Sequence, residues 1–364
     1  MSRFVEEIVG KPAKPAGNGN KSVDDISLEI LADFEACGLT AEELRGKKIP
    51  KRPELLGSWL CQGDLGFVFA PRGLGKTWLA KALTKTLAKG NGQELACWKA
   101  GEPQTVLYVD GEMNLDQSTS REQALQIDPE GRWNILHHDI LFLEKGRSLN
   151  LTEPATQKAL TMYVEKLNAN VLALDNLSSL FYGMKENEAD GWEMVLPWLL
   201  ELRRKKVTVI IVHHSGTDGQ RMRGTTKRED HAHWVIRLEP SKEGEPDEGA
   251  RFRLNFTKCR NCPYKEVPPV ELYFKPAGLK LGVVEMSWKV MDNLEVLKML
   301  MADYKEARCT ELAEDMGLTK GAVSKLANKG EKEGWLTISG RDYVWKEPPV
   351  DVFTQGAGCG HEAR

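Results

Sequence analysis

From residue 65 onward, short apolar runs of strand length alternate with longer amphipathic segments of helical period. The apolar runs cover residues 66–70, 105–110, 170–177 and 207–214. The segments with helical spacing cover residues 77–90, 113–126, 153–169 and 191–206. Strands joined by helices of this length require crossover connections, which favour a parallel sheet covered by helices on both faces. The pattern therefore predicts the α/β fold class, with a mostly parallel sheet flanked by helices.

The pattern changes after residue 235. Residues 234–239, 251–258 and 270–275 read as successive strands, which we expect at an antiparallel edge of the same sheet. Further on come a helix over 293–307, two short helices separated by residues 317–319, and a hairpin over 335–346. Helix, helix-turn-helix and β wing is the order of a small winged-helix domain.

The two ends of the chain are less regular. Residues 8–22 are rich in Gly, Pro, Lys and Asn, and a short amphipathic helix over 26–36 is expected to end at Gly38. The predicted organisation has four parts. An N-terminal arm with a short helix, partly disordered, covers 1–45, and the α/β domain covers 46–286. The winged-helix domain covers 287–347, and a disordered tail covers 348–364.

Composition narrows the class of protein. The formal net charge of −3 does not by itself indicate a nucleic-acid-binding protein, although local basic patches remain compatible with one. No apolar run approaches the roughly 18 residues that a membrane span needs, and the first residues lack the apolar core of a secretory signal. Seven scattered cysteines argue against a disulfide framework. We therefore expect a cytoplasmic protein without a membrane partner.

A Gly-rich segment after the first apolar run matches the P-loop spacing GxxxxGK[ST], with Ala70 in place of the first Gly. In this motif the backbone N–H groups face the phosphates, Lys76 reaches the β- and γ-phosphates, and the Thr77 hydroxyl ligates Mg²⁺. The alternative is a plain Gly-rich turn before a helix, which the strand-loop-helix context disfavours. ATP and Mg²⁺ are thus the expected cofactors. The predicted nucleotide-binding residues are Ala70, Pro71, Arg72, Gly73, Leu74, Gly75, Lys76, Thr77 and Trp78.

Carboxylates follow two of the other apolar runs. Asp175 ends the run 171–175, where it would point into the ligand crevice and hold Mg²⁺. Glu112 lies just past the run 105–110 and is the candidate general base, with Asp110 as the competing candidate. Acidic residues at strand ends are also common in solvated turns, which is the alternative explanation for each.

Several blocks occur together with the P-loop: KRPELLGSWL, VLYVDGEM, VLALDNLSSL, VIIVHHSG and RGTT. Over roughly residues 50–275 the chain resembles the RecA-like ATPases, in particular plasmid RepA-type hexameric helicases and the ATPase domain of DnaB-type helicases. The resemblance implies that Glu112 is the base, that Asp175 is the Walker B residue and that His214, in the pair His213-His214, senses the γ-phosphate. Locally satisfied histidines are the alternative.

The resemblance also implies a homo-oligomer, expected to be a hexameric ring, in which basic residues of a neighbouring subunit complete each ATP site. Lys258 and Arg260 look like the Lys-x-Arg-Asn segment of DnaB-type helicases, and Arg223 lies in a segment like the RGSS stretch of RepA-type proteins. Such a guanidinium would stabilise transition-state charge. Solvated surface side chains are the alternative.

Two regions are candidates for nucleic-acid contact. The basic loop 215–230 would face single-stranded DNA in the ring channel, although it contains no aromatic side chain for base stacking. The second helix of the winged-helix domain would contact double-stranded DNA, unless the domain docks a protein instead. The predicted contact residues are Arg221, Lys227, Arg228, Lys320, Ser324, Lys325 and Lys329. The Cys259–Cys262 spacing lacks a second ligand pair nearby, so no zinc is expected.

These observations indicate an ATP-hydrolysing RecA-like motor acting on DNA, such as an oligomeric helicase or replication protein of a plasmid, phage or mobile element. Two alternatives stay open. One is an ATP-switched DNA-binding regulator or loader, and the other is a KaiC-like signalling ATPase without nucleic acid.

Overall fold

A computed structural model describes residues 22–127, 130–183, 189–216, 221–223, 227–241, 250–277, 282–316 and 318–346. The chain divides into two compact units, Met1–Lys51 and Arg52–Arg364. In the first unit, Ser22 and Asp25 form a capping box for helix α2 (Val23–Cys37), which is followed by Gly38 as predicted. Thr40 and Glu43 cap the short helix α3 (Ala41–Gly46) in the same way, and neither helix has a buried residue.

The second unit is built on a large mixed sheet with the order β13-β12-β11-β10-β3-β9-β8-β6-β7. The strands from β10 to β7 are parallel, and they are β10 (Trp234–Pro240), β3 (Leu65–Ala70), β9 (Thr208–His214), β8 (Val171–Asp175), β6 (Val106–Asp110) and β7 (Trp133–His137). The strands on the other side are antiparallel, and they are β11 (Ala250–Cys259), β12 (Val270–Pro276) and β13 (Val284–Val290). The predicted α/β class with a mostly parallel sheet is confirmed.

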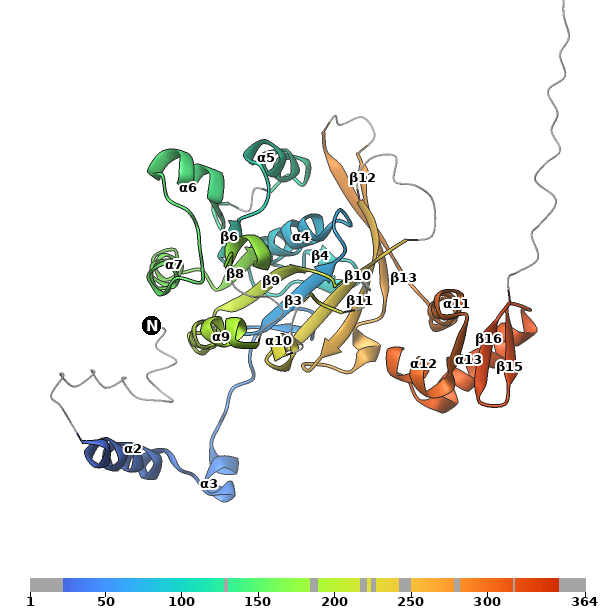
Figure 1. Cartoon of the computed structure of the whole chain (residues 1–364), viewed down its shortest axis with the longest axis horizontal. Coiled ribbons are helices and arrows are strands. Elements are labelled where there is room, and N and C mark those ends of the chain that lie inside the picture. The colour runs from blue at the N-terminus through green and yellow to red at the C-terminus, as the bar shows by residue number, and fades with distance from the viewer. Residues whose placement is uncertain are drawn as a thin grey trace, which may run out of the picture. The chain divides into compact units, whose positions relative to one another are not determined.

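Alternation along each parallel strand supplies both faces of this sheet with apolar side chains. On one face, Val68 and Ala70 of β3 pack with helix α4 (Lys76–Lys89). On the other face, Phe67 and Phe69 pack with helices α7 (Pro154–Lys166), α8 (Leu177–Leu180) and α9 (Ala189–Arg204). Figure 1 shows α4 on one side of the sheet and α7 and α9 on the other.

An aromatic cluster closes the α4 face beside the antiparallel strands. The Trp59 ring meets Trp234 edge-on at 5.0 Å between centroids, and Phe256 and Trp98 pack around the same ring. A Cβ on Gly66 of β3 would lie 2.0 Å from the Trp234 ring, so only glycine permits this close approach. The cluster thereby anchors the β10–β11 pair to the P-loop strand.

Several elements differ from the sequence-based expectation. Strand β10 pairs in parallel with β3, so it belongs to the parallel part of the sheet rather than to the antiparallel edge. The pattern did not predict β7, the following helix α6 (His138–Lys145) or β13. Helix α5 (Leu115–Ala124) forms where the stretch 113–126 was expected to be helical. Two small hairpins also form, from β1 (Glu54–Leu56) with β2 (Leu60–Cys61) and from β4 (Glu94–Leu95) with β5 (Trp98–Lys99).

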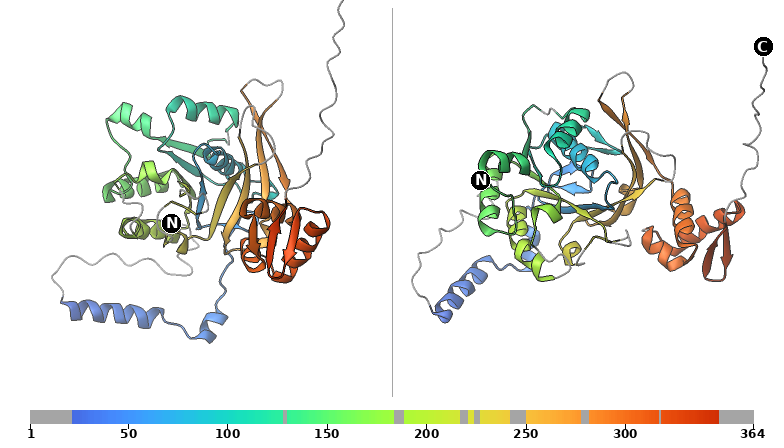
Figure 2. Two further views of the ribbon diagram at one scale, coloured as in Figure 1. Left: turned by 45° about the vertical axis from the view of Figure 1, so that its right-hand side comes forward. Right: turned by 45° about the horizontal axis from the view of Figure 1, so that its top comes forward.

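The C-terminal elements enclose their own apolar core. They are α11 (Asn293–Tyr304), β14 (Glu306–Arg308), α12 (Cys309–Asp315), α13 (Lys320–Lys332), β15 (Leu336–Ser339) and β16 (Asp342–Trp345). Leu297, Leu312, Val323 and Trp335 are buried in this core, and the three strands form an antiparallel sheet in the order β14-β16-β15. Figure 2 shows these elements in orange and red.

Two short helical turns complete the described elements, α10 (Lys227–Asp230) and a 3-10 turn at Tyr264–Glu266. Within the described ranges, none of the helices combines the length and apolarity that crossing a membrane requires.

Candidate active site

The candidate catalytic residues meet at one edge of the sheet, because they follow the carboxyl ends of neighbouring parallel strands. Ala70, the last residue of β3, lies opposite His214 at the end of β9. Asp110, the last residue of β6, lies opposite Asp175 at the end of β8. These residues were predicted to lie at the ends of different strands, and the observed strand order makes those ends neighbours.

The loop between β3 and α4 has the backbone that phosphate binding requires. Gly73 and Gly75 adopt left-handed conformations with φ values of 77° and 97°, and Gly75 is the N-cap of α4. A Cβ on Gly75 would lie 2.6 Å from the Phe252 ring, which adds a steric reason for glycine. Ala70 is a buried β-strand residue, so alanine fits where the motif usually has glycine. The N-terminal N–H groups of α4 therefore face the loop as an anion site.

Lys76 lies folded over this loop. Its Nζ donates hydrogen bonds to the carbonyl oxygens of Ala70, at 3.2 Å, and Pro71, at 2.8 Å. Burial lowers the pKa of Lys76, while the nearby negative charges of Glu112 and Asp175 act in the opposite direction. The ammonium group is thus held at the loop, facing two carboxylates.

Asp175 is fully buried and is the candidate residue whose surroundings fit a bound cation best. Tyr108 donates a 2.6 Å hydrogen bond to its Oδ2, whereas Oδ1 has no hydrogen-bond partner of ordinary geometry among the described residues. Burial raises the pKa of Asp175 to about 6, and the negative charge of Asp110 adds to the rise, although the Tyr108 and Thr77 side chains oppose it. A buried carboxylate beside a threonine hydroxyl fits Mg²⁺, which would stabilise the ionised form.

Asn176 links the candidate base to the candidate sensor. Its Nδ2 donates to Glu112 Oε2 and lies 3.1 Å from His214 Nε2, and Glu112 Oε1 lies 3.7 Å from the same nitrogen. The Glu112 side chain is 43% exposed and thus open to water, whereas the His214 side chain is 10% exposed. Asn176 directly follows Asp175 in the sequence but belongs to no motif that marks it as a site residue.

His213 has a different role from its neighbour. Its ring is buried, and burial together with the positive charge of Arg228 lowers its pKa to about 3. The Arg228 Nη1 lies 2.8 Å from His213 Nε2, and the guanidinium lies 5.8 Å from the Trp192 ring centroid. Arg228 is fully buried, so the prediction that it contacts nucleic acid is wrong, because its side chain supports the core under β9.

The other basic residues of this loop lie closer to the surface. Arg221 and Arg223 are exposed, and the Arg223 backbone N–H donates to the His214 carbonyl oxygen at 3.0 Å. Lys227 is exposed and forms an ion pair with Glu193 at 2.9 Å. Loop residues 217–220 and 224–226 lie outside the described residues.

Lys258 and Arg260 lie near the amino ends of the parallel strands β10 and β3, whereas the P-loop follows the carboxyl end of β3. Lys258 pairs with Val235 near the start of β10, and Trp234 pairs with Gly66 near the start of β3. The length of β3, roughly 20 Å at about 3.3 Å per residue, separates those amino ends from the P-loop. Lys258 Nζ donates to the Glu229 carbonyl oxygen, and Arg260 Nη2 donates to that of Asp230 at 2.8 Å. They therefore do not join the site of their own subunit.

Cys259 and Cys262 lie close together, with 3.5 Å between their Sγ atoms. The group of potential ligand side chains in the described part of the chain is His137, His138 and Asp139, on β7 and α6. Cys359 and His361, in the C-terminal tail, lie outside the described residues.

Helix α13 carries the C-terminal candidates. Lys320, Lys325 and Lys329 are exposed. Ser324 is half-buried, and its hydroxyl lies 3.1 Å from the Tyr343 hydroxyl. The contact of Ser324 with DNA stays a prediction, and its hydroxyl also links α13 to the hairpin.

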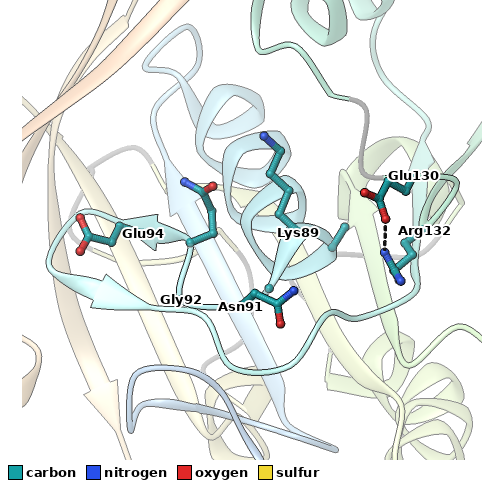
Figure 3. A pocket seen from close by; sticks show the side chains of 9 residues that line it. Lys89, Asn91, Gly92, Glu94, Glu130 and Arg132 are labelled. Carbon is teal, nitrogen blue, oxygen red and sulfur yellow. Dashed lines mark hydrogen bonds and ion pairs between the residues drawn. The ribbon is translucent and has the colours of Figure 1, made fainter.

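A cavity of about 740 Å³ lies at the far end of α4 from the P-loop, next to Lys89, Asn91, Glu94, Glu130 and Arg132 (Figure 3). The C-terminus of a helix carries partial negative charge, which disfavours phosphate. This cavity is thus separate from the nucleotide site.

Comparison with known protein families agrees with the geometry of this site. The family model described as an AAA domain matches residues 32–220, slightly more than half of the chain. Among solved structures, the chain is similar to the flagellar accessory protein FlaH from Methanocaldococcus jannaschii, with 14% identity and a TM-score of 0.42 over 63% of this chain and 91% of that chain. A search of the curated proteins gave no match. Since the family match spans the P-loop together with Glu112, Asp175 and His214, the chain belongs to the AAA domain family of ATPases.

Proposed function

We propose that this protein is an ATP-hydrolysing RecA-like motor that works on DNA in the cytoplasm as a homo-oligomeric ring. A helicase or replication protein of a plasmid, phage or mobile element is the function that fits best. The observation that carries the hydrolytic part is the meeting of Lys76, Glu112 and Asp175 at one sheet edge.

Each residue has a distinct task in hydrolysis. Lys76 neutralises charge on the β- and γ-phosphate oxygens, and Thr77 and Asp175 hold Mg²⁺. When bound, Mg²⁺ supplies further neutralisation of the charge on the phosphates. Glu112 polarises the attacking water and accepts its proton, because its carboxylate is open to water beside the loop. Asn176 fixes the positions of Glu112 and His214, so that His214 responds to the γ-phosphate.

The position of Lys258 and Arg260 is compatible with the proposed oligomer. Their distance from the P-loop of their own subunit prevents them from acting there, whereas a neighbouring subunit in a ring could present them to the next site. Arg223, near His214, is the competing candidate for this contribution.

The DNA part of the proposal rests on α13. We infer that the C-terminal elements form a winged-helix domain, because α12, α13 and the β15–β16 hairpin follow in that order around one core. Lys320, Lys325 and Lys329 give α13 an exposed basic side that suits phosphates, and Arg221 and Lys227 are candidates for single-stranded DNA. The absence of aromatic residues from 215–230 favours, as a second candidate function, an ATP-switched regulator or loader that binds duplex DNA.

The test compares ATP turnover with and without single- and double-stranded DNA, together with the mass of the oligomer. A triple change of Lys320, Lys325 and Lys329 to Ala should weaken duplex binding and reduce its salt dependence by about one unit of slope for each lysine that neutralises a phosphate. The control changes Lys158 and Lys166, two exposed lysines of α7, to Ala, and is compared with the test variant per charge removed. DNA-stimulated turnover with strand displacement supports the motor, and stimulation without displacement supports the regulator. Turnover that is indifferent to DNA would instead support a signalling ATPase.

A further inference from the structure

A buried cluster of charged and hydroxyl side chains lies behind the candidate base. Lys81 of α4 and Asp110 of β6 both have fully buried side chains, with 3.6 Å between Nζ and Oδ2. Ser118 and Glu122 of α5 complete the cluster. Buried charges are costly unless they are paired, so each charged side chain in this cluster depends on its partners to stay buried.

Asp110 holds the turn that carries Glu112. Its Oδ1 accepts hydrogen bonds from the backbone N–H groups of Glu112, at 3.3 Å, and Met113, at 3.1 Å. Its Oδ2 accepts a 2.7 Å hydrogen bond from the Ser118 hydroxyl. With both oxygens engaged and no exposure, Asp110 offers less room for an attacking water than Glu112 does, which favours Glu112 as the general base.

Lys81 connects this turn to the P-loop helix. It lies four residues after Thr77, and therefore one turn further along α4 on the same side. Its Nζ donates to Ser118 Oγ, at 2.9 Å, and to Glu122 Oε1, at 2.8 Å. The ammonium also lies 4.8 Å from the centroid of the Tyr108 ring, whose hydroxyl donates to Asp175.

We propose that Lys81 and Asp110 are positioning residues that hold the Glu112 turn in register with the P-loop helix, which keeps the candidate base aimed at the γ-phosphate. This inference rests on the proposed role of Glu112. A rigid link matters because a misplacement of about 1 Å can cost on the order of 10²-fold in rate. Both side chains are fully buried, so the two residues act through Glu112.

The experiment uses the full-length chain with Asp110→Ala, Asp110→Asn and Lys81→Met. We expect Asp110→Ala and Lys81→Met to lower kcat about tenfold or more, while the KM for ATP and the affinity for a fluorescent ADP stay within about twofold. Asp110→Asn keeps an oxygen for the two amides and should recover most of the rate. Lys85→Met, one turn further along α4, is the matched control, because Lys85 contacts Leu125 rather than this cluster.

Two further measurements separate positioning from general damage. Hydrogen exchange followed by mass spectrometry should show faster exchange in the peptide containing Glu112 and Met113 in Asp110→Ala, but not in Lys85→Met. In a Glu112→Gln background, adding Asp110→Ala should not lower the residual rate further, because the side chain that it positions is already inactive.

The inference is overturned if the wild-type protein hydrolyses ATP and Asp110→Ala matches it, or if Asp110→Ala lowers the residual rate of Glu112→Gln by its full factor. If Lys81→Met does not fold, the two Asp110 variants and the exchange measurement still decide. If the wild-type protein has no ATPase activity, the proposed function fails by itself. The exchange of the Glu112 turn then still shows whether Asp110 holds it.

Discussion

Replacing Asp175 with Asn should stabilise the nucleotide-free protein and remove its activity. The Asp175 carboxyl is fully buried, and its pKa is raised from an ordinary value of 3.8 to about 6. The folded protein therefore binds this proton more tightly than the unfolded chain does, and the stability that this provides is lost as the pH rises from about 4 to about 6. At about 1.36 kcal/mol per pKa unit, the ionised carboxylate destabilises the folded state at pH 7 by up to about 3 kcal/mol. An amide of the same shape removes this charge and still accepts the hydrogen bond from Tyr108.

The assay is thermal unfolding of the wild-type protein and Asp175→Asn between pH 4 and pH 8, without nucleotide or Mg²⁺. With about 2–4 °C per kcal/mol for a domain of about 150–250 residues, the variant should melt several degrees higher at pH 7. The difference should shrink toward pH 4, where the wild-type carboxyl is protonated. Adding Mg²⁺ and ADP should raise the melting temperature of the wild-type protein more than that of the variant, because the variant lacks the carboxylate. Asp116→Asn, an exposed carboxylate on α5, is the control and should change stability by less than about 0.5 kcal/mol.

Two results would refute this reasoning. If Asp175→Asn melts at or below the wild-type temperature at pH 7, burial of the ionised carboxylate does not destabilise the folded protein. If the variant is more stable by the same amount at pH 4 and pH 7, the gain comes from packing rather than from charge. Either result would also weaken the assignment of Asp175 as a Mg²⁺ ligand.

Other substitutions test the remaining parts of the molecule. Lys76→Ala should abolish ATP hydrolysis and weaken nucleotide binding, and normal turnover would contradict the P-loop assignment. Glu112→Gln should bind Mg²⁺ and ATP but hydrolyse ATP very slowly, as single-turnover kinetics would show, because an amide is a poor base. Gly330→Ala should destabilise the C-terminal elements by about 1–3 kcal/mol and lower their melting temperature, because its Cβ would lie 2.5 Å from the Trp335 ring. Arg260→Ala should keep nucleotide binding and lose about 10³-fold in turnover. Activity should partly return when it is mixed with Lys76→Ala, and a co-assembled mixture that stays inactive would exclude a role in trans.

The sequence was sufficient for the parts of the fold that follow from local patterns. The P-loop matches a fixed motif spacing, and the four strands that end at the site are continuous apolar runs, whose carboxyl ends parallel pairing brings to one edge. Glu112 and Asp175 could be selected for this reason. Strand β13 was missed although apolar and polar residues alternate from Val284 to Val290, because the predicted domain boundary between residues 286 and 287 divides this run.

Tertiary contacts explain the remaining errors. The burial of Arg228 depends on His213 and Trp192, which are distant in sequence, so the Arg-rich loop gave no sign of it. The contact of Asn176 with Glu112 and that of Asp110 with Lys81 likewise depend on neighbouring strands and helices, and no spacing rule predicts them.

Strand β13 has a consequence for any shortened form of the protein. It pairs with β12 from Val284 to Val290, and α11 begins only three residues later, so the chain enters the C-terminal elements directly from the sheet. A chain that stops before residue 287 would lack most of β13 and leave the β12 edge with unpaired backbone groups, which is a template for aggregation. A chain that ends at Met291 keeps β13 whole. Insolubility of the shorter form would therefore report on an exposed sheet edge and not on DNA binding.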